Sequence, residues 1–447
     1  SQRQIQWVNK PTNYLTSSHM AGNTNKIAIT ARGKIAIATA DNSRLVEVAT
    51  PEKSRSRNAI LSKDGKIVYA LNDASGEIEI WQYPADGSYN PKQLTKNGQS
   101  FRWNLWLSPD EKWLAHDDRK GALWLRNMKT GKSRKISQQI AYPYSDVVWS
   151  NNSQLIAFNR TTIENERSHV VVYSLKNNQL IDLTSNKYES FSPAFSKNGN
   201  WLYFLSKRQF DATPGSPWGD RNTGAVFDKR TKIYAYGLNS DVTFPFQSPN
   251  ELIQTKNKKR TKKSKVIDWK KVKQKLWLVP LEAGNYTKLK ATEKHLYLIN
   301  QPISPKSIPS LVSIKIEAKK AKLTNFASDV QDYHLSHSGK KLYLQVGNAK
   351  QAKFLIVDAN DKLPKDLKDV TLNVKDWQIK INPVNEWLAI FHDTWLMHRE
   401  SLFDPKMRGL NWRQVKKKYE ALVNRVTDRH ELNDLFSQMT GELNLLH

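Results

Sequence analysis

The sequence predicts a mainly-β fold, namely a seven-bladed β-propeller followed by three helices that form a small partial domain. Three observations lead to this prediction. A hairpin pattern recurs along the chain, its copies are regularly spaced, and the apolar spacing changes from a strand period to a helical period near residue 382.

The recurring pattern is an apolar residue, a serine, a short polar turn and then an alternating apolar strand. Its fullest copy is 195–204, with the sequence FSKNGNWLYF. Four similar copies begin at Leu61, Leu107, Trp149 and Leu335. Because turn-forming residues separate two short β-prone runs, each copy is predicted to be a β-hairpin.

The spacing of the copies indicates the fold. When they are aligned, one turn position is occupied by Gly65, Glu111, Ser153, Gly199 and Gly339. The first three steps are 46, 42 and 46 residues, and two degenerate copies with turn positions at Asn25 and Glu293 bring the number to seven. A period of about 40–50 residues with several strands per repeat is typical of a propeller. We therefore predict a connector at 1–12 and a propeller at 13–382. Two β-sandwiches would also give short strands, but they need no fixed register.

Individual strands can be placed within the first four blades. The first blade holds a hairpin at 27–38 with Gly33 at its turn, and the second holds an alternating strand at 78–83. The third has a strand at 122–126. The apolar run 170–175 in the fourth blade is predicted to be a central strand covered on both faces.

The fifth repeat is interrupted twice. Segment 207–220 is rich in Gly and Pro and is predicted to be a long excursion. Its Ser216 is not in a nucleophile-elbow pattern, and we interpret it as structural. Segment 256–265 is a dense basic block, which is predicted to be a solvated loop. A docking loop for polyanions or acidic peptides is the alternative.

After residue 382 the apolar residues step by three and four. This pattern predicts a helix at about 385–402 rather than an eighth hairpin. A second helix is predicted to start with Asn411 as its N-cap, and a third with the capping-box-like pair Asp428 and Glu431. Together they predict a helical unit at 383–447 that is truncated and leaves an apolar face for a partner.

Composition sets further bounds. The net charge is +28, and the excess of lysine is spread along the chain, so a nucleic-acid partner is disfavoured although such a field attracts polyanions. The chain has no cysteine, which excludes thiol catalysis but does not choose between a cytoplasmic and a periplasmic location. No apolar run is long enough for a membrane span, and the first residues do not form an intact signal peptide. No cofactor is expected, and the histidines other than His447 lack metal-ligand spacing.

The segment 394–412, with the sequence TWLMHRESLFDPKMRGLNW, resembles the opening of the first catalytic subdomain of tricorn-type proteases. These are serine peptidases of the same clan as carboxy-terminal processing proteases. The segment 431–447 and the propeller repeats extend the resemblance over nearly the whole chain. The family plan comprises a six-bladed propeller, a seven-bladed propeller, a first catalytic subdomain, a PDZ domain and a second catalytic subdomain. Only the second and third parts are expected here.

The resemblance implies a function and a site residue. The propeller would gate or guide peptide substrates, and the helical unit would supply His447 as the catalytic histidine. The nucleophilic serine would belong to the missing second catalytic subdomain, so this chain alone is expected to be inactive. The family also implies a homo-hexamer. Two features depart from the family, namely Leu446, where the archaeal founder has serine, and the strongly basic charge.

Two other functions stay open. The chain would be a non-enzymatic binding propeller of the Tol-like kind, or a polyanion-binding scaffold that uses 256–265. Sequence beyond His447 with a PDZ-like domain would favour the peptidase, whereas salt-sensitive nucleic-acid binding would favour the scaffold.

Overall fold

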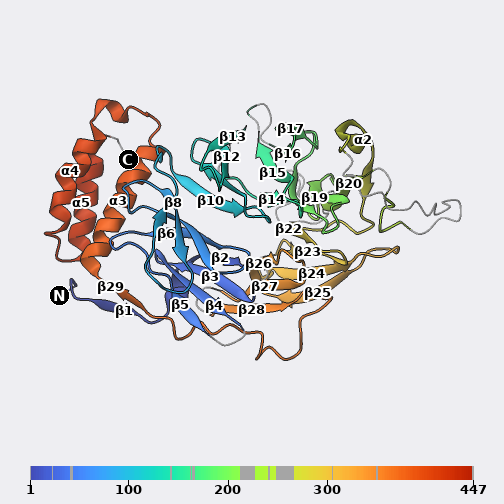
Figure 1. Cartoon of the computed structure of the whole chain (residues 1–447), viewed down its shortest axis with the longest axis horizontal. Coiled ribbons are helices and arrows are strands. Elements are labelled where there is room, and N and C mark those ends of the chain that lie inside the picture. Colours follow the sequence, from blue (N-terminus) through green and yellow to red (C-terminus); the bar gives the residue numbers. More distant parts are fainter. Residues whose placement is uncertain are drawn as a thin grey trace, which may run out of the picture.

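The computed structural model describes residues 2–22, 24–40, 44–140, 143–161, 163, 167–211, 227–239, 242–247, 266–304, 306–348 and 351–444. Its strands form seven antiparallel sheets of three or four strands, arranged as the blades of a propeller, and three C-terminal helices pack at one side (Figure 1). The prediction of a seven-bladed propeller followed by a helical unit is confirmed. The bounds of all elements are given below.

Blades one to three have four consecutive strands each. Blade one consists of β2 (Leu15–Met20), β3 (Lys26–Ala31), β4 (Lys34–Thr39) and β5 (Leu45–Glu47). Blade two consists of β6 (Ser56–Leu61), β7 (Ile67–Asn72), β8 (Glu79–Pro84) and β9 (Lys92–Gln93). Blade three consists of β10 (Arg102–Leu107), β11 (Trp113–Asp118), β12 (Ala122–Asn127) and β13 (Ser133–Gln138).

The remaining blades repeat this order. Blade four consists of β14 (Val148–Trp149), β15 (Leu155–Thr161), β16 (Ser168–Ser174) and β17 (Gln179–Asp182). Blade five consists of β18 (Ser190–Phe195), β19 (Trp201–Lys207), β20 (Thr231–Gly237) and β21 (Leu276–Leu278). Blade six consists of β22 (Tyr286–Ala291), β23 (His295–Asn300), β24 (Ser310–Lys315) and β25 (Leu323–Ser328). Blade seven has β26 (Val330–Leu335), β27 (Lys341–Val346) and β28 (Lys353–Asp358).

All seven sequence repeats fall on the same connection, the turn between the first and second strands of a blade. The repeated serine holds this turn together. Ser62 Oγ accepts a hydrogen bond from Ile67 N at 3.0 Å and donates to Asp64 Oδ1 at 2.7 Å. Equivalent bonds are accepted by Ser108, Ser150, Ser196 and Ser336. The serine therefore recurs because it satisfies a backbone N–H that the turn leaves unpaired.

Among the strands of the described residues, no blade combines strands from the two ends of the propeller sequence. In blade seven, the segment around Val370 and Leu372 lies where the other blades have a fourth strand. Ile356 N donates to Val370 O, and Leu372 N donates to Phe354 O. Outside the blades, β1 (Gln6–Val8) pairs antiparallel with β29 (Ile379–Ile381). The predicted connector at 1–12 thus contains a strand that ties the start of the chain to the residues just before the helices.

The insertions in blade five separate its second, third and fourth strands. The described part of these connections contains one short helix, α2 (Trp269–Gln274), which the sequence did not predict. Asp268 caps it by accepting hydrogen bonds from Lys270 N and Lys271 N. Residues 212–226 of the first excursion and the basic block 256–265 lie outside the described residues.

The tail is helical, as its apolar spacing predicted. It consists of α3 (Pro383–Ser401), the single turn η2 (Met407–Gly409), α4 (Trp412–Val423) and α5 (Arg429–Gly441); a further short turn, η1 (Pro11–Tyr14), precedes β2. Asn411 caps α4, and Asp428 caps α5 by accepting from Glu431 N at 3.0 Å. In return Glu431 accepts from Thr427 N, one residue before the cap. The two predicted N-caps are therefore confirmed.

One hydrophobic core joins the helices to the propeller. It combines Ile60, Leu71, Ile80 and Leu105 of blades two and three with apolar side chains of α3, α4 and α5. Figure 1 shows the helices beside β6, β8 and β10. The apolar stripe predicted for the third helix is part of this core and includes Leu432, Leu435 and Met439. The helical unit consequently has a fixed position on the propeller.

Candidate functional site

The predicted catalytic residue, His447, lies outside the described residues, which end at Asn444. The element that leads to it is described. Helix α5 buries Met439 completely, and Leu443 beyond its end is also buried at 1 % exposure. Leu443 N and Asn444 N donate to Thr440 O and Gly441 O, both at 3.0 Å. The backbone is therefore anchored to the core up to three residues before His447.

Three groups of ion pairs fix α3 to the propeller. Arg399 binds Glu77 through two hydrogen bonds, Nη1 to Oε1 at 2.6 Å and Nη2 to Oε2 at 2.8 Å. Arg32 binds Glu386 in the same bidentate way, at 2.6 and 2.9 Å. The third group joins Asp393 Oδ2 to Arg55 at 3.0 Å and to Arg57 at 2.5 Å. Bidentate guanidinium–carboxylate pairs fix orientation as well as distance, so these contacts hold α3 in one orientation on the propeller.

A buried carboxylate lies beside the third of these groups. Asp73 is 4 % exposed, and its Oδ1 accepts from Arg55 N at 2.7 Å. Burial raises the pKa of Asp73 to about 6, against the opposing effect of this hydrogen bond; Asp393 adds to the rise, while the charges of Arg57 and Arg55 oppose it. The junction between propeller and helices therefore contains a group that titrates in mildly acidic solution.

These junction residues were not predicted from the sequence. The paired side chains are more than 300 residues apart in sequence. Charged pairs of this separation leave no local pattern, so only the three-dimensional structure brings them together.

Inside the propeller a belt of polar side chains joins neighbouring blades. Asn58 Nδ2 donates to Asn104 Oδ1 at 2.8 Å, between blades two and three. Ser192 Oγ donates to Asp146 Oδ2 at 3.0 Å, between blades four and five. Asn58, Ser192 and Asp146 have positive φ angles of 50°, 49° and 54°, which direct the backbone away from the regular ladder.

A second part of the belt joins blade six to blade seven and blade one to blade two. Lys288 Nζ donates to Asp332 Oδ1 at 2.7 Å, and His334 Nε2 lies 3.2 Å from Asp332 Oδ2. Burial acts to raise the pKa of Asp332, but His334 and Lys288 outweigh it and hold this pKa well below its ordinary value. His19 receives a hydrogen bond from Leu61 N at 3.2 Å, and burial together with His334 lowers its pKa to about 3. Asp332 and His19 therefore each link two neighbouring blades.

The belt residues share a sequence signal, namely a fixed position within the repeat. Asn58, Asn104, Asp146, Ser192 and Asp332 each stand seven positions before the shared turn position of their repeat. A polar residue at one fixed register in several repeats predicts a ring around the propeller axis.

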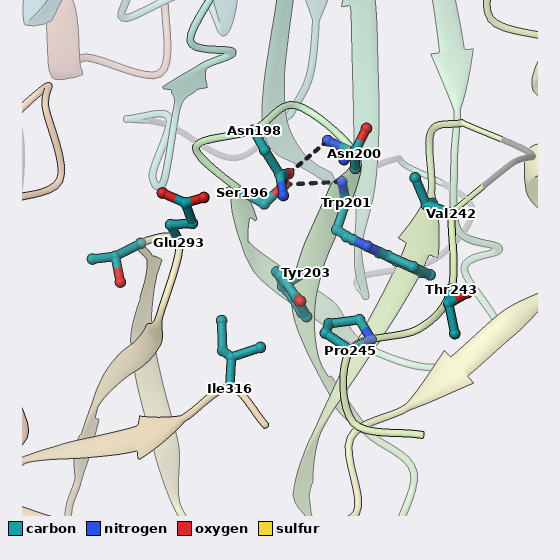
Figure 2. Close-up of a pocket in the computed structure, with 11 residues that line it drawn as sticks. Ser196, Asn198, Asn200, Trp201, Tyr203, Val242, Thr243, Pro245, Glu293 and Ile316 are labelled. Carbon is teal, nitrogen blue, oxygen red and sulfur yellow. Dashed lines mark hydrogen bonds between the residues drawn. The ribbon is translucent and has the colours of Figure 1, made fainter. Parts of the chain in front are cut away.

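Two cavities of about 240 Å³ each lie between blades. The first is formed by the turns of blades five and six, with Ser196, Asn198 and Trp201 on one side and Glu293 and Ile316 on the other (Figure 2). Hydrogen bonds from Asn200 N to Asn198 Oδ1 and from Trp201 N to Ser196 Oγ shape its wall. The second cavity is polar and is lined by Ser145, Asp146, Asn159, Ser168 and Glu189, among others.

His392 and His398 of α3 each contact a single polar partner rather than a shared centre. His392 Nε2 lies 2.5 Å from Glu420 Oε1, and burial lowers its pKa. His398 Nδ1 lies 2.8 Å from Thr394 O. No group of three or more His, Cys, Asp or Glu side chains in the described part of the chain could hold a metal ion. Ser216 lies outside that part. In the same part, no helix is long and apolar enough to cross a membrane.

In comparisons with known proteins, the propeller and the helical unit each match a family model. A family model described as the tricorn protease second beta propeller domain matches residues 15–356. A second model, described as the tricorn protease C1 domain, matches residues 383–441.

Individual relatives agree with the family models. The tricorn protease homolog of Saccharolobus solfataricus is 22% identical over 436 residues, which cover 95% of this chain and 38% of the relative. The putative tricorn-like protease C-terminal subunit of Sulfurisphaera tokodaii is 24% identical over 373 residues, covering 79% of this chain and 41% of the relative. The chain therefore spans about two-fifths of the length of these relatives.

A solved structure shows the same fold. The crystal structure of the tricorn protease superposes with a TM-score of 0.82 at 16% identity, over 99% of this chain and 42% of that chain. The propeller match alone covers more than half of the chain. The chain therefore belongs to the tricorn protease family.

Proposed function

We propose that this chain is the substrate-guiding propeller and the first catalytic subdomain of a tricorn-type serine peptidase that degrades peptides. The propeller would occupy residues 13–382 and the helical unit 383–447. Family membership supports the reaction class. The observation that carries the assignment to this chain is the anchoring of α5, which leads to His447, in a core shared with blades two and three.

In this proposal His447 acts as the general base. A serine hydroxyl attacks an amide only when an adjacent base takes its proton, and histidine is the usual base. The serine and the remaining catalytic groups would come from a second catalytic subdomain that is not in this chain. A PDZ domain in the same polypeptide and assembly into a homo-hexamer are parts of the proposal. The chain by itself is therefore expected to be inactive.

The contacts of α3 explain why a rigid junction would serve this function. A general base must lie within hydrogen-bond reach of the proton that it removes, at about 2.6–3.2 Å between heavy atoms. A small rotation of the helical unit would move the end of α5 by more than this tolerance. The bidentate pairs of Arg399 and Arg32 oppose such a rotation.

The test is peptide hydrolysis by the intact native protein, with and without His447. An unstructured fluorogenic peptide is the substrate, because it can reach a site with restricted access without first unfolding. His430 on α5 is exposed and provides a matched control. Loss of activity in His447→Ala but not in His430→Ala supports the proposal.

A further inference from the structure

The turns between the first and second strands of several blades converge at one end of the propeller axis. The first strands of adjacent blades contact one another, so the turns that follow them lie around the axis. His337 N in blade seven donates to Gly22 O in blade one at 3.0 Å. A Cβ at Gly22 would lie 3.2 Å from Lys63 Cα of blade two. A Cβ at Gly339 would lie 3.1 Å from Lys197 Cε, so the side chain of Lys197 reaches from blade five to blade seven.

This convergence gathers basic side chains from four blades. They are Lys63 of blade two, Lys197 of blade five, Lys290 of blade six and His337 of blade seven. Burial and the nearby charge of Lys290 lower the pKa of Lys197 to about 8. Burial, followed by Lys197 and Lys63, lowers the pKa of His337 to about 4. Mutual repulsion of close basic groups has this direction.

Within the described part of the chain, the three lysines have no neutralising carboxylate. Among the described residues, no carboxylate lies within 4 Å of the ammonium groups of Lys63, Lys197 or Lys290, in contrast to Lys288, which lies 2.7 Å from Asp332. The carboxylates near the turns already have partners. Glu111 Oε1 accepts from Lys63 N at 2.6 Å, and Asp64 Oδ1 accepts from Ser62 Oγ at 2.7 Å.

If these lysines had only a structural role, nearby carboxylates would be expected to pair with them, as Asp332 pairs with Lys288 in the belt. Unpaired cations that converge at the end of a ring focus a positive potential there and attract anions. The cavity of Figure 2 lies beside this point, because Ser196 and Asn198 on its wall flank Lys197 in sequence. Glu293 on the opposite wall would repel an anion placed deep in the cavity, so the ligand is expected at the lysines.

We propose that Lys63, Lys197, Lys290 and His337 form an anion-binding site whose ligand is a carboxylate of a peptide. Ammonium groups donate charge-assisted hydrogen bonds to carboxylates, and a neutral imidazole adds a further donor. The carboxylate belongs either to an acidic side chain or to the C-terminus of the peptide. This inference rests on the proposed function, since it names the class of peptide that the propeller would select.

The test is fluorescence anisotropy at about 0.15 M salt, where long-range fields are screened. The probes are rhodamine-labelled octapeptides with four glutamates or four glutamines, each with a free or an amidated C-terminus. Binding is measured to the intact protein in a His447→Ala background, so that the reading needs no turnover. A preference for glutamate peptides, or for free C-termini, identifies the source of the carboxylate.

The deciding comparison is between two triple variants of equal charge. The site variant carries Lys63→Met, Lys197→Met and Lys290→Met, and the control variant carries Lys112→Met, Lys271→Met and Lys319→Met at side chains that are 74–76% exposed. We expect the preference for anionic peptides to fall about tenfold in the site variant, which corresponds to about 1.4 kcal/mol, and to persist in the control. The single variant Lys197→Gln, which retains a polar side chain, is expected to show part of the same loss.

An equal loss in both triple variants would overturn the proposal in favour of a general effect of net charge. An unchanged preference in the site variant or in Lys197→Gln would overturn it as well. Either failure leaves the hydrolysis test of His447 unaffected, because binding is read without catalysis. Conversely, absence of peptidase activity would not alter the binding comparison.

Discussion

Arg399 of α3 and Glu77 of blade two, which are 322 residues apart in sequence, form a bidentate ion pair across the junction of helices and propeller. The guanidinium also lies over the ring of Trp395, with Cζ 5.2 Å from the ring centroid. Trp395 in turn exchanges indole hydrogen bonds with Trp412, since each Nε1 donates to the other backbone carbonyl at 2.8 and 3.1 Å. The pair thus connects the propeller directly to the core of the helical unit.

Replacement of Arg399 by Met is expected to destabilise the junction. It removes the two charge-assisted hydrogen bonds to Glu77 and the two to Glu400 Oε1, and it leaves Glu77, which is 28% exposed, without this partner, at a cost of about 1–3 kcal/mol. Arg399→Lys should restore only part of this, because an ammonium cannot form the bidentate pair. Urea unfolding and hydrogen exchange of the α3–α5 amides measure the effect. Lys112→Met is the control, since its pair spans 3.9 Å at the surface and should contribute less than about 1 kcal/mol. Equal effects of both substitutions would contradict a special role for Arg399.

Ser62 provides a test of the repeated turn. Its side chain is buried and accepts from Ile67 N, so Ser62→Ala leaves that backbone N–H without its acceptor. We expect a loss of about 1–3 kcal/mol in the free energy of unfolding. Ser88→Ala is the control, because Ser88 Oγ donates to Asp86 Oδ1 in an exposed turn as Ser62 Oγ donates to Asp64 Oδ1. If Ser62→Ala were as harmless as Ser88→Ala, the repeated serine would not have the structural role assigned here.

Asp73 should make the stability of the junction depend on pH. Its pKa in the folded protein is about 6, above the ordinary value of 3.8, so the folded state holds a proton that the unfolded state has lost. This contribution is fully present below about pH 3.8 and is lost as the pH rises through 6. The stability of the wild type minus that of Asp73→Asn should therefore fall between pH 4 and pH 7, by on the order of 1–3 kcal/mol.

Asp86→Asn supplies the opposite sign for comparison. The Ser88 hydroxyl, followed by Ser88 N, lowers the pKa of Asp86, so its contribution is present above the ordinary pKa and is lost as the pH falls. Urea midpoints measured at a series of pH values give both difference curves. A flat curve for Asp73→Asn would show that burial does not shift this carboxyl.

The sequence was informative where structure repeats locally and uninformative where it does not. Five of the seven turns could be located because their serine accepts a hydrogen bond from a backbone N–H only a few residues away, as Ser62 does from Ile67, and the other two were located from their spacing. The caps Asn411 and Asp428 were predictable for the same reason. Helix α2 follows a long insertion and has no repeat register, so it was not predicted.

Among the candidate site residues, too, some could be found from the sequence and others could not. The belt residue Asn58 stands at a fixed register and could have been found from the repeats. Three members of the basic group, Lys63, Lys197 and His337, likewise stand two positions before the shared turn position. The approach of Lys197 to Gly339 of blade seven, however, follows only from the curvature of the ring. His447 was indicated by resemblance alone, and it stays a prediction.

The most direct measurement is the rate of hydrolysis of an unstructured fluorogenic peptide by the intact native protein, compared among wild type, His447→Ala and His430→Ala. A general base contributes about 10²–10⁴-fold to the rate. The account predicts a loss of this size in kcat for His447→Ala, with unchanged circular dichroism, and wild-type rates for His430→Ala. Wild-type hydrolysis by His447→Ala would contradict the account and would leave the helical unit without a catalytic role.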